Sequence, residues 1–126
     1  NAYAMYLVVR ESLNMSPGKM AAQVGHAVMQ LAHEYAELVV RDVCLGTKAA
    51  KMAAYTSWMN NCRKIVLRAD DTQWEALKRL STIGWDLALV IDSGYTEIEP
   101  NSETVIGFWP MKKSEAPGII KNLKLY

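Results

Sequence analysis

Short apolar runs alternate along the chain with longer segments in which apolar residues recur at helical spacing. The short runs are rich in β-branched and aliphatic residues, and their length favours strands over helices. Residues 87–91 are apolar throughout, as in strands that are buried on both faces. The pattern predicts four strands, at residues 6–9, 63–69, 87–91 and 104–109, and a short edge segment at residues 123–126.

A long helix is predicted to begin after the first strand. Ser16 is a natural N-cap, and Pro17 is favoured at the first helical position. We expect this helix to extend to about Cys44, with Gly46 as its stop signal, and to be largely buried. It has an apolar face (Met20, Val24, Ala27, Leu31, Tyr35 and Leu38) and a face of mainly small residues (Ala22, Gly25, Met29, Ala32 and Ala36).

The third face of this helix is polar. Its members follow steps of three and four residues and therefore point the same way: Lys19, Gln23, His26, Gln30, His33 and Glu37. At the start of a helix, free backbone N–H groups and the helix dipole favour an anion. The sequence thus predicts an anion-binding function near Lys19, whereas the far end of the face is expected to be ordinary solvated surface.

The other segments complete an α/β pattern. Residues 47–60 are predicted to form a second helix, and Thr72 and Glu75 have the spacing of a capping box for a third helix that Gly84 closes. Asp92 directly follows the apolar strand at residues 87–91. Because ligands of open α/β sheets lie beyond the carboxyl ends of strands, Asp92 is a candidate functional residue.

Length and composition limit the class of protein. A chain of 126 residues fits a single domain, and 51% hydrophobic with 21% charged residues is a globular balance. The net charge of +1 excludes a general nucleic-acid binder, so any RNA contact must be local. No apolar run approaches the roughly 20 residues of a membrane span, and no secretory signal is seen, so we expect a cytoplasmic protein without membrane contact. Asn1 and Ala2 could derive from an expression vector, and no argument rests on them.

Several familiar kinds of site are disfavoured. A phosphate loop ending at Gly18 and Lys19 would need a glycine at Leu13 and a hydroxyl residue at Met20. His26 and His33 lack the further ligands of a metal site. Ser16, His26 and Asp92 are the residue types of a catalytic triad, but a triad is disfavoured because the sequence has no nucleophile-elbow motif. Two cysteines, Cys44 and Cys62, are too few for a disulfide framework and are expected to be reduced and mostly buried.

Three residues are left as a candidate constellation. They are a lysine at a helix start, Lys19, an acid at a strand end, Asp92, and a threonine four residues later, Thr96. Such a set could hold an anionic backbone, orient a water molecule and stabilise the charge that develops on an ester carbonyl. It would need no metal ion, no cofactor and no covalent intermediate.

Two stretches of the chain resemble a known family. They are Met15-Ser16-Pro17-Gly18-Lys19-Met20-Ala21-Ala22-Gln23 with His26-Ala27, and Asp92-Ser93-Gly94-Tyr95-Thr96-Glu97. Together with Leu7-Val8-Val9-Arg10 and the order of the pieces between them, they resemble the archaeal and eukaryotic type 2 peptidyl-tRNA hydrolases. The resemblance covers nearly the whole chain.

The resemblance implies a fold, an activity and a set of site residues. The fold would be a three-layer α/β/α sandwich with a four-stranded mixed β-sheet, commonly in a homodimer. The activity would be hydrolysis of the ester between peptide and tRNA in peptidyl-tRNA. Lys19, Asp92 and Thr96 match the family's implicated positions, and the residues expected to bind the substrate are Gln23, His26, Ser16, Gly18, Gly94, Arg10 and Trp109.

The chain departs from the family pattern at three places. Ser93 replaces an alanine, Asn101-Ser102 replaces glycine-threonine, and Phe108-Trp109 replaces a small strand end that contains glycine. Asn101 is tolerable where the turn needs a positive φ, because asparagine visits that region more readily than most residues. Trp109 could fill space near the acidic loop, stack on the terminal adenine, pack at a dimer contact or simply pack in the core, as buried aromatic residues usually do.

Two other function classes stay open on the sequence alone. One is a catalytically silent relative that acts as a module for binding RNA ends or proteins. The other is a hydrolase of a different small ester or amide, which is favoured if Trp109 closes the cleft to tRNA.

Overall fold

A computed structural model describes residues 2–41, 46–94 and 97–126. The longer strands are β1 (Tyr3–Arg10), β2 (Lys64–Ala69), β3 (Leu87–Ile91) and β4 (Glu103–Phe108), and two-residue strands are β5 (Met111–Lys112) and β6 (Lys124–Leu125). The α-helices are α1 (Pro17–Val40), α2 (Gly46–Trp58), α3 (Asp71–Arg79) and α4 (Gly118–Lys121). Single 3-10 turns occupy η1 (Glu11–Leu13), η2 (Leu80–Ile83) and η3 (Lys113–Glu115).

The strands form one mixed sheet in the order β3-β4-β1-β2-β6, with β5 paired to β1. β1 and β2 are parallel, whereas β4 is antiparallel to both β1 and β3. The prediction of an α/β fold with a mixed sheet is confirmed, but the sheet has six strands where four were predicted. The predicted edge segment near the C-terminus is β6, which pairs with β2.

The two additional pairings explain the error in strand count. β5 has two residues, which is too short for a periodicity to mark it in the sequence, whereas β6, also of two residues, was predicted as an edge segment but was not among the four strands of the predicted sheet. β5 pairs with Tyr3 and Ala4 and thereby extends β1 beyond its predicted start. Only the tertiary fold brings these short segments beside a longer strand.

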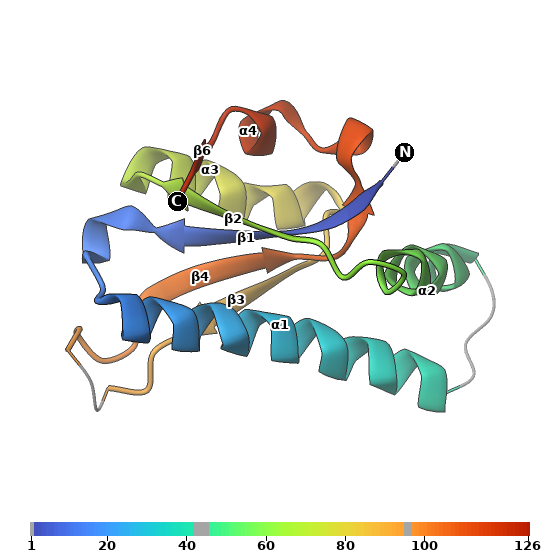
Figure 1. Ribbon diagram of the computed structural model, residues 1–126, viewed down its shortest axis with the longest axis horizontal. Coiled ribbons are helices and arrows are strands. Elements are labelled where there is room, and N and C mark those ends of the chain that lie inside the picture. The colour runs from blue at the N-terminus through green and yellow to red at the C-terminus, as the bar shows by residue number, and fades with distance from the viewer. Residues whose placement is uncertain (1, 42–45, 95–96) are drawn as a thin grey trace.

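Helices cover both faces of the sheet, as Figure 1 shows. Successive residues of β1 point to opposite faces, so Tyr6 and Val8 join a core with α3 and α4, while Leu7 and Val9 join a core with α1 and α2. Both faces of the central strand are therefore buried. This agrees with the continuous apolar character of the strand in the sequence.

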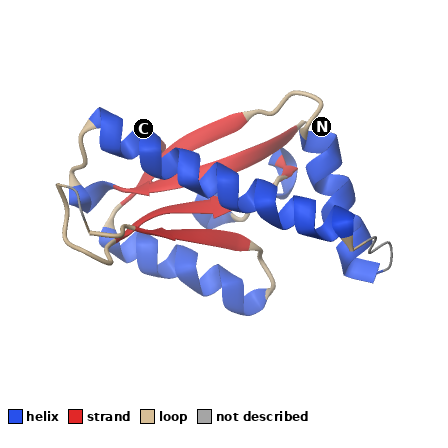
Figure 2. Cartoon of the chain, turned by 90° about the horizontal axis from the view of Figure 1, so that it is seen from below, coloured by secondary structure: helices blue, strands red, loops and turns tan. Residues whose placement is uncertain are grey.

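α1 lies across the strands on one face, with its predicted apolar side toward the sheet (Figure 2). The expectation that α1 is largely buried is wrong, because only Gln23, Ala27, Leu31 and Leu38 are buried. The face of small residues is exposed: Ala22, Gly25, Met29, Ala32 and Ala36. A helix that rests on one layer can bury only one side, and no described element covers the other.

The sequence predicted the N-cap of α1 correctly but assigned the capping box of α3 to the wrong residues. Ser16 caps α1 as predicted, accepting a hydrogen bond from the Lys19 N–H at 3.3 Å. The capping box of α3 uses Asp70 and Gln73 in place of Thr72 and Glu75, because β2 ends at Ala69 and the helix follows at once.

Two smaller expectations also differ from the structure. Gly46, predicted to stop the first helix, opens α2 with a φ of +63°. Cys62 is exposed, contrary to the expectation of a buried thiol, and Cys44 lies outside the described residues.

The contact of α1 with the sheet is closest at Gly107 of β4. A Cβ atom at this position would lie 3.1 Å from the Ala27 Cβ, 3.2 Å from the Leu31 Cδ1 and 3.3 Å from a methyl of Leu7. Side chains of α1 and β1 therefore meet above Gly107, a strand residue that has no side chain. This close approach fixes the height of α1 above the sheet.

The topology gathers three strand ends at one edge. Since β4 is antiparallel to both neighbours, β3 runs parallel to β1, and β1 is parallel to β2. The carboxyl ends of all three strands lie at the left of Figure 1, where α1 also begins. Asp92 thus lies at the edge where ligands of open α/β sheets bind.

We expect Gly107→Val to lower the free energy of unfolding by about 1 to 3 kcal/mol, because it overpacks the contact with α1. Ala36→Val is the matched control on the same helix, since Ala36 is exposed and points away from the sheet. That change should lower stability by no more than about 0.7 kcal/mol, because valine has a lower helix propensity than alanine. Urea unfolding measures both values, and an unchanged midpoint for Gly107→Val would show that the close contact is not required.

Candidate active site

Lys19 and Asp92 meet where the start of α1 faces the end of β3. The Lys19 Nζ donates to the Asp92 Oδ1, although the two residues are far apart in the sequence. The Lys19 side chain is 10% exposed and that of Asp92 is 3% exposed. The two residues that the sequence analysis isolated therefore form a largely buried ion pair.

The start of α1 is clamped by an acidic residue that sequence reasoning did not assign. Glu97 accepts hydrogen bonds from the Ser16 hydroxyl at 2.7 Å and from the Ser16 backbone N–H at 2.8 Å. These two bonds hold the pKa of the Glu97 carboxyl below its usual value. Ser16, expected to bind substrate, is thus engaged by Lys19 and Glu97. The sequence signal that could have identified Glu97 is its position directly after Thr96 in the family-like motif.

The loop after β3 holds the Asp92 carboxylate in a fixed orientation. The Gly94 N–H donates to the Asp92 Oδ2 at 3.0 Å, and the Asn101 N–H donates to the Asp92 backbone carbonyl at 2.9 Å. A Cβ at Gly94 would lie 2.8 Å from the Pro100 Cβ, and the φ of Gly94 is +101°, so this turn requires glycine. Asn101 has a φ of +65°, which confirms that its turn needs the left-handed region.

Gln23 anchors α1 to the sheet. It is 3% exposed, and its Nε2 donates to the Thr104 Oγ1 at 2.9 Å. Thr104 in turn donates to the Val90 carbonyl at 3.1 Å, beside an irregularity in the β3–β4 register. This chain of hydrogen bonds joins α1, β4 and β3 directly behind Asp92. The sequence analysis placed Gln23 at the site. It did not identify Thr104, because no local sequence pattern indicates that this hydroxyl is buried.

A groove of about 420 Å³ runs from the ion pair along α1 and β3. The helix side carries Lys19, Ala22, Gln23, His26 and Gln30, and the strand side carries residues 90–93. His26 is exposed on the third turn of α1 and faces this groove, as expected for a substrate-binding residue. The polar face of α1 therefore borders the groove only as far as Gln30.

Other predicted site residues lie at the same edge but outside the groove. Arg10 ends β1 and pairs with Asp71 of α3 at 3.1 Å, on the sheet face opposite α1. Gly18 is exposed in the first turn of α1, with open space around its Cα. Thr96, the third predicted catalytic residue, lies outside the described residues.

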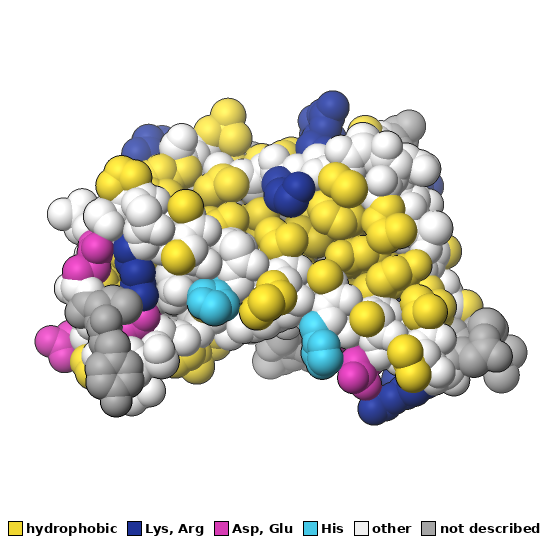
Figure 3. Space-filling view, turned by 60° about the horizontal axis from the view of Figure 1, so that its bottom comes forward, with side chains coloured by type: hydrophobic (Ala, Val, Ile, Leu, Met, Phe, Trp, Pro, Cys, Tyr) yellow, Lys and Arg dark blue, Asp and Glu magenta, His cyan; other side chains and the backbone are white. Residues whose placement is uncertain are grey.

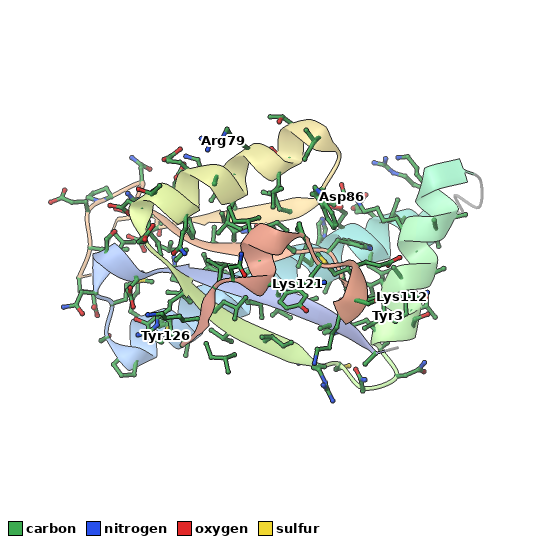
Figure 4. The ribbon with its side chains drawn as sticks, turned by 90° about the horizontal axis from the view of Figure 1, so that it is seen from above. Tyr3, Arg79, Asp86, Lys112, Lys121 and Tyr126 are labelled. Atoms are coloured by element: carbon green, nitrogen blue, oxygen red, sulfur yellow. The ribbon has the colours of Figure 1, made fainter. Side chains whose placement is uncertain are left out.

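Trp109 lies at the other end of the sheet. Its backbone N–H donates to Asp86 at the start of β3, the residue labelled in Figure 4, whereas Asp92 follows the end of that strand. Its Nε1 donates to the Lys51 carbonyl at 2.8 Å, and its ring packs on Tyr55. The expectation that Trp109 contacts the substrate or the acidic loop is therefore not supported, because β4 runs antiparallel to β3 and ends where β3 begins.

The arrangement has the parts of an acid–base and anion site. A carboxylate with fixed orientation can accept a proton from water, and an ammonium beside it can stabilise negative charge on a reacting oxygen. Within residues 2–41, 46–94 and 97–126, no three histidine, cysteine or acidic side chains are grouped to hold a metal ion.

Comparison with known proteins identifies the family. Residues 3–126 match the family model described as "Peptidyl-tRNA hydrolase PTH2". The chain belongs to this family. It is 32% identical over 126 residues to a peptidyl-tRNA hydrolase of Methanococcus maripaludis strain C6, covering 98% of each chain. A peptidyl-tRNA hydrolase of Pyrobaculum aerophilum is 31% identical, with 97% of this chain and 96% of that protein covered.

Mammalian relatives are longer. The mouse protein named "Peptidyl-tRNA hydrolase 2, mitochondrial" is 33% identical over 98% of this chain, which covers 64% of that protein. Its name assigns a compartment that differs from the cytoplasmic location expected above, so that expectation stays a prediction. None of the helices that the structure describes is long and apolar enough to cross a membrane.

The Glu97 clamp in this PTH2 domain generates a prediction of pH dependence. Because the folded-state pKa of Glu97 is lowered, its contribution to stability is fully present above its ordinary pKa and is lost as the pH falls through the lowered value. We expect Glu97→Gln to destabilise the protein at about pH 7 and to differ less from the parent at about pH 3.5.

Urea unfolding at the two pH values measures this difference. Glu99→Gln is the matched control, since Glu99 is a nearby exposed carboxylate without a hydrogen bond to α1. A stability difference that is the same for Glu97→Gln at both pH values would contradict the role of the ionised clamp.

Proposed function

We propose that this PTH2 family member hydrolyses the ester between peptide and tRNA in peptidyl-tRNA at the Lys19–Asp92 pair. The observation that carries the proposal is a buried ammonium–carboxylate pair at the mouth of a groove, in a chain that matches the family over residues 3–126. The relatives named above carry this activity in their names.

In the proposed reaction Asp92 acts as the general base. Its Oδ2 is held by the Gly94 N–H and its Oδ1 by Lys19, so the carboxylate has little freedom to rotate. A water molecule beside it loses a proton to Asp92 as its oxygen attacks the ester carbonyl carbon. The tetrahedral intermediate then expels the ribose oxygen, which takes the proton back from Asp92.

Lys19 supplies positive charge in this proposal. The start of α1 adds the partial positive charge of its free N–H groups, and the low exposure of Lys19 limits screening by water. When the substrate enters, the ammonium exchanges part of its contact with Asp92 for the carbonyl oxygen, on which negative charge develops, or for a neighbouring phosphate.

The remaining predicted residues are assigned binding roles. Thr96 follows Asp92 by four positions and is proposed to donate a hydroxyl hydrogen bond to the substrate. His26 lies along the groove, and Arg10 and Gly18 lie at the sheet edge where the tRNA would approach. Only a few local cations meet the phosphates, in keeping with the net charge of +1.

We expect Asp92→Asn and Lys19→Ala each to reduce kcat/KM for a peptidyl-tRNA by about 100-fold or more. The first change removes the base and the second removes the cation. Release of tRNA from N-acetylaminoacyl-tRNA, followed on an acid gel, measures the rate. Lys48→Ala is the matched control, because Lys48 is an exposed lysine outside the groove.

Thermal unfolding must accompany these assays, since removing one partner of a buried pair destabilises the fold. No release by the parent protein at micromolar concentration would refute hydrolysis. If the parent also binds tRNA with salt-dependent affinity, the silent relative considered from the sequence would be favoured.

We further propose that the chain forms a homodimer through an apolar surface on α1 and β2. Its residues surround a shallow hollow of about 650 Å³: Pro17, Met20, Ala21, Val24, Gly25, Val28 and Met29 of α1, with Lys64 and Val66 of β2. Figure 3 shows a broad area of yellow hydrophobic side chains on this side of the molecule. Met29 is 59% exposed. Contiguous apolar surface of this kind marks an interaction site, and the small residues Ala21 and Gly25 permit a second helix to approach closely.

We expect Met29→Glu to shift the protein to the monomer, because it would bury an unpaired charge within this surface. Sedimentation velocity over a concentration series measures the association. Val40→Glu is the control, since Val40 is 84% exposed at the far end of α1, outside this surface. A parent protein that is monomeric throughout, or equal effects of the two changes, would contradict the proposed interface.

A further inference from the structure

The outer edge of β3 is open beside the proposed active site. β3 pairs with β4 on one side, and no strand among the described residues pairs with the other. The groove that begins at Lys19 and Asp92 is lined on its strand side by residues 90–93, so it meets this edge at the C-terminal end of β3. The last residues of the unpaired strand therefore form part of one wall of the groove, and the open edge continues from there toward Leu87.

The hydrogen-bonding pattern shows which backbone groups face outward. The Trp109 N–H donates to the Asp86 carbonyl, and Ala88 is paired with Gly107, so residues 86, 88 and 90 face β4. Successive residues alternate in an antiparallel ladder. The N–H and C=O groups of Leu87, Leu89 and Ile91 therefore point away from β4 along the open edge.

The opposite wall of the groove carries short or neutral polar side chains. Beyond Lys19 these are Ala22, Gln23, His26 and Gln30. None of the described groove residues other than Lys19 is a lysine or arginine, so the groove offers no series of cations for a phosphate backbone. Amide groups and an imidazole, which can donate and accept hydrogen bonds beside a strand edge, suit a chain of peptide groups instead.

The length of the groove fits a short extended peptide. Lys19 and Gln30 are eleven positions apart, which corresponds to about 16 Å along a helix at 1.5 Å per residue. An extended chain rises about 3.3 Å per residue, so about five residues span this length.

We propose that the peptide part of peptidyl-tRNA binds in this groove as an additional strand on the open edge of β3. The proposal rests on the proposed function, which places the ester carbonyl at Lys19 and Asp92. The ester is at the C-terminus of the peptide and Asp92 follows the C-terminus of β3, so the bound peptide runs parallel to β3, with its earlier residues toward Leu87. Main-chain hydrogen bonds are available to a peptide of any sequence. In this arrangement the tRNA lies beyond the end of the sheet at which β1, β2 and β3 terminate.

The first test measures KM of the intact protein for N-acetyl-tetraalanyl-tRNA and for three variants of this substrate. Each variant is N-methylated at a different one of the three alanines farthest from the ester. In a strand, alternate residues bond to the same neighbour, so methylation should raise KM about three- to tenfold at alternate positions and leave the intervening position little changed. Equal KM values for all methylated substrates would overturn strand addition. Absence of hydrolysis of the unmethylated substrate would instead contradict the proposed function.

A second test changes the protein. Leu89→Pro removes an outward N–H, and proline is tolerated at strand edges. Leu89→Ala is its matched control, because it also removes the leucine side chain but keeps the N–H. We expect Leu89→Pro to raise KM for N-acetyl-tetraalanyl-tRNA about three- to tenfold relative to Leu89→Ala, with a smaller change for N-acetylalanyl-tRNA. His33→Ala, on α1 beyond the groove, should alter neither value. Equal KM values for the two Leu89 variants would contradict the proposal, and the methylated substrates test it even if Leu89→Pro does not fold.

Discussion

The close approach of α1 to β4 at Gly107 determines where the other parts of the site lie. Ala27 and Leu31 rest on a residue without a side chain, so the helix lies low across β4 and β3. With α1 at this height, Gln23 reaches Thr104 and Lys19 reaches Asp92. A larger residue at position 107 would lift the helix away from the strand end that it has to meet.

The electrostatics of the site follow from burial. Lys19 and Asp92 are largely shielded from water, and the Lys19 ammonium interacts both with the Asp92 carboxylate and with the nearby Glu97 carboxylate. Gly94 and Asn101 hold the aspartate from the loop side, whereas Lys19 is a flexible side chain on a helix. In the proposed reaction the fixed member of the pair is the base and the member that can move is the cation, as a site needs when it receives an anionic substrate.

One helix serves several purposes because its sides face different surroundings. One side packs on the sheet, a second borders the groove with its polar side chains, and a third presents exposed apolar residues beside β2. The groove side and the apolar side begin at the same turn. In the proposed dimer, association would therefore hold the start of α1, where Lys19 and the Ser16 cap are placed.

The sequence by itself determined the four long strands, the edge segment that is β6, the start of α1 after Ser16 and, through the family-like motifs, the assignment of Lys19 and Asp92 to one candidate site. These rest on local spacing, short-range capping and motif order, which a chain carries without its fold. It did not determine the short strand β5, the exposure of the small face of α1, or the position of Trp109 away from the acidic loop. Those depend on which segments lie side by side: a two-residue strand exists only through its partner, a helix face is buried only if a layer covers it, and the direction of β4 decides at which end of the sheet its last residue lies.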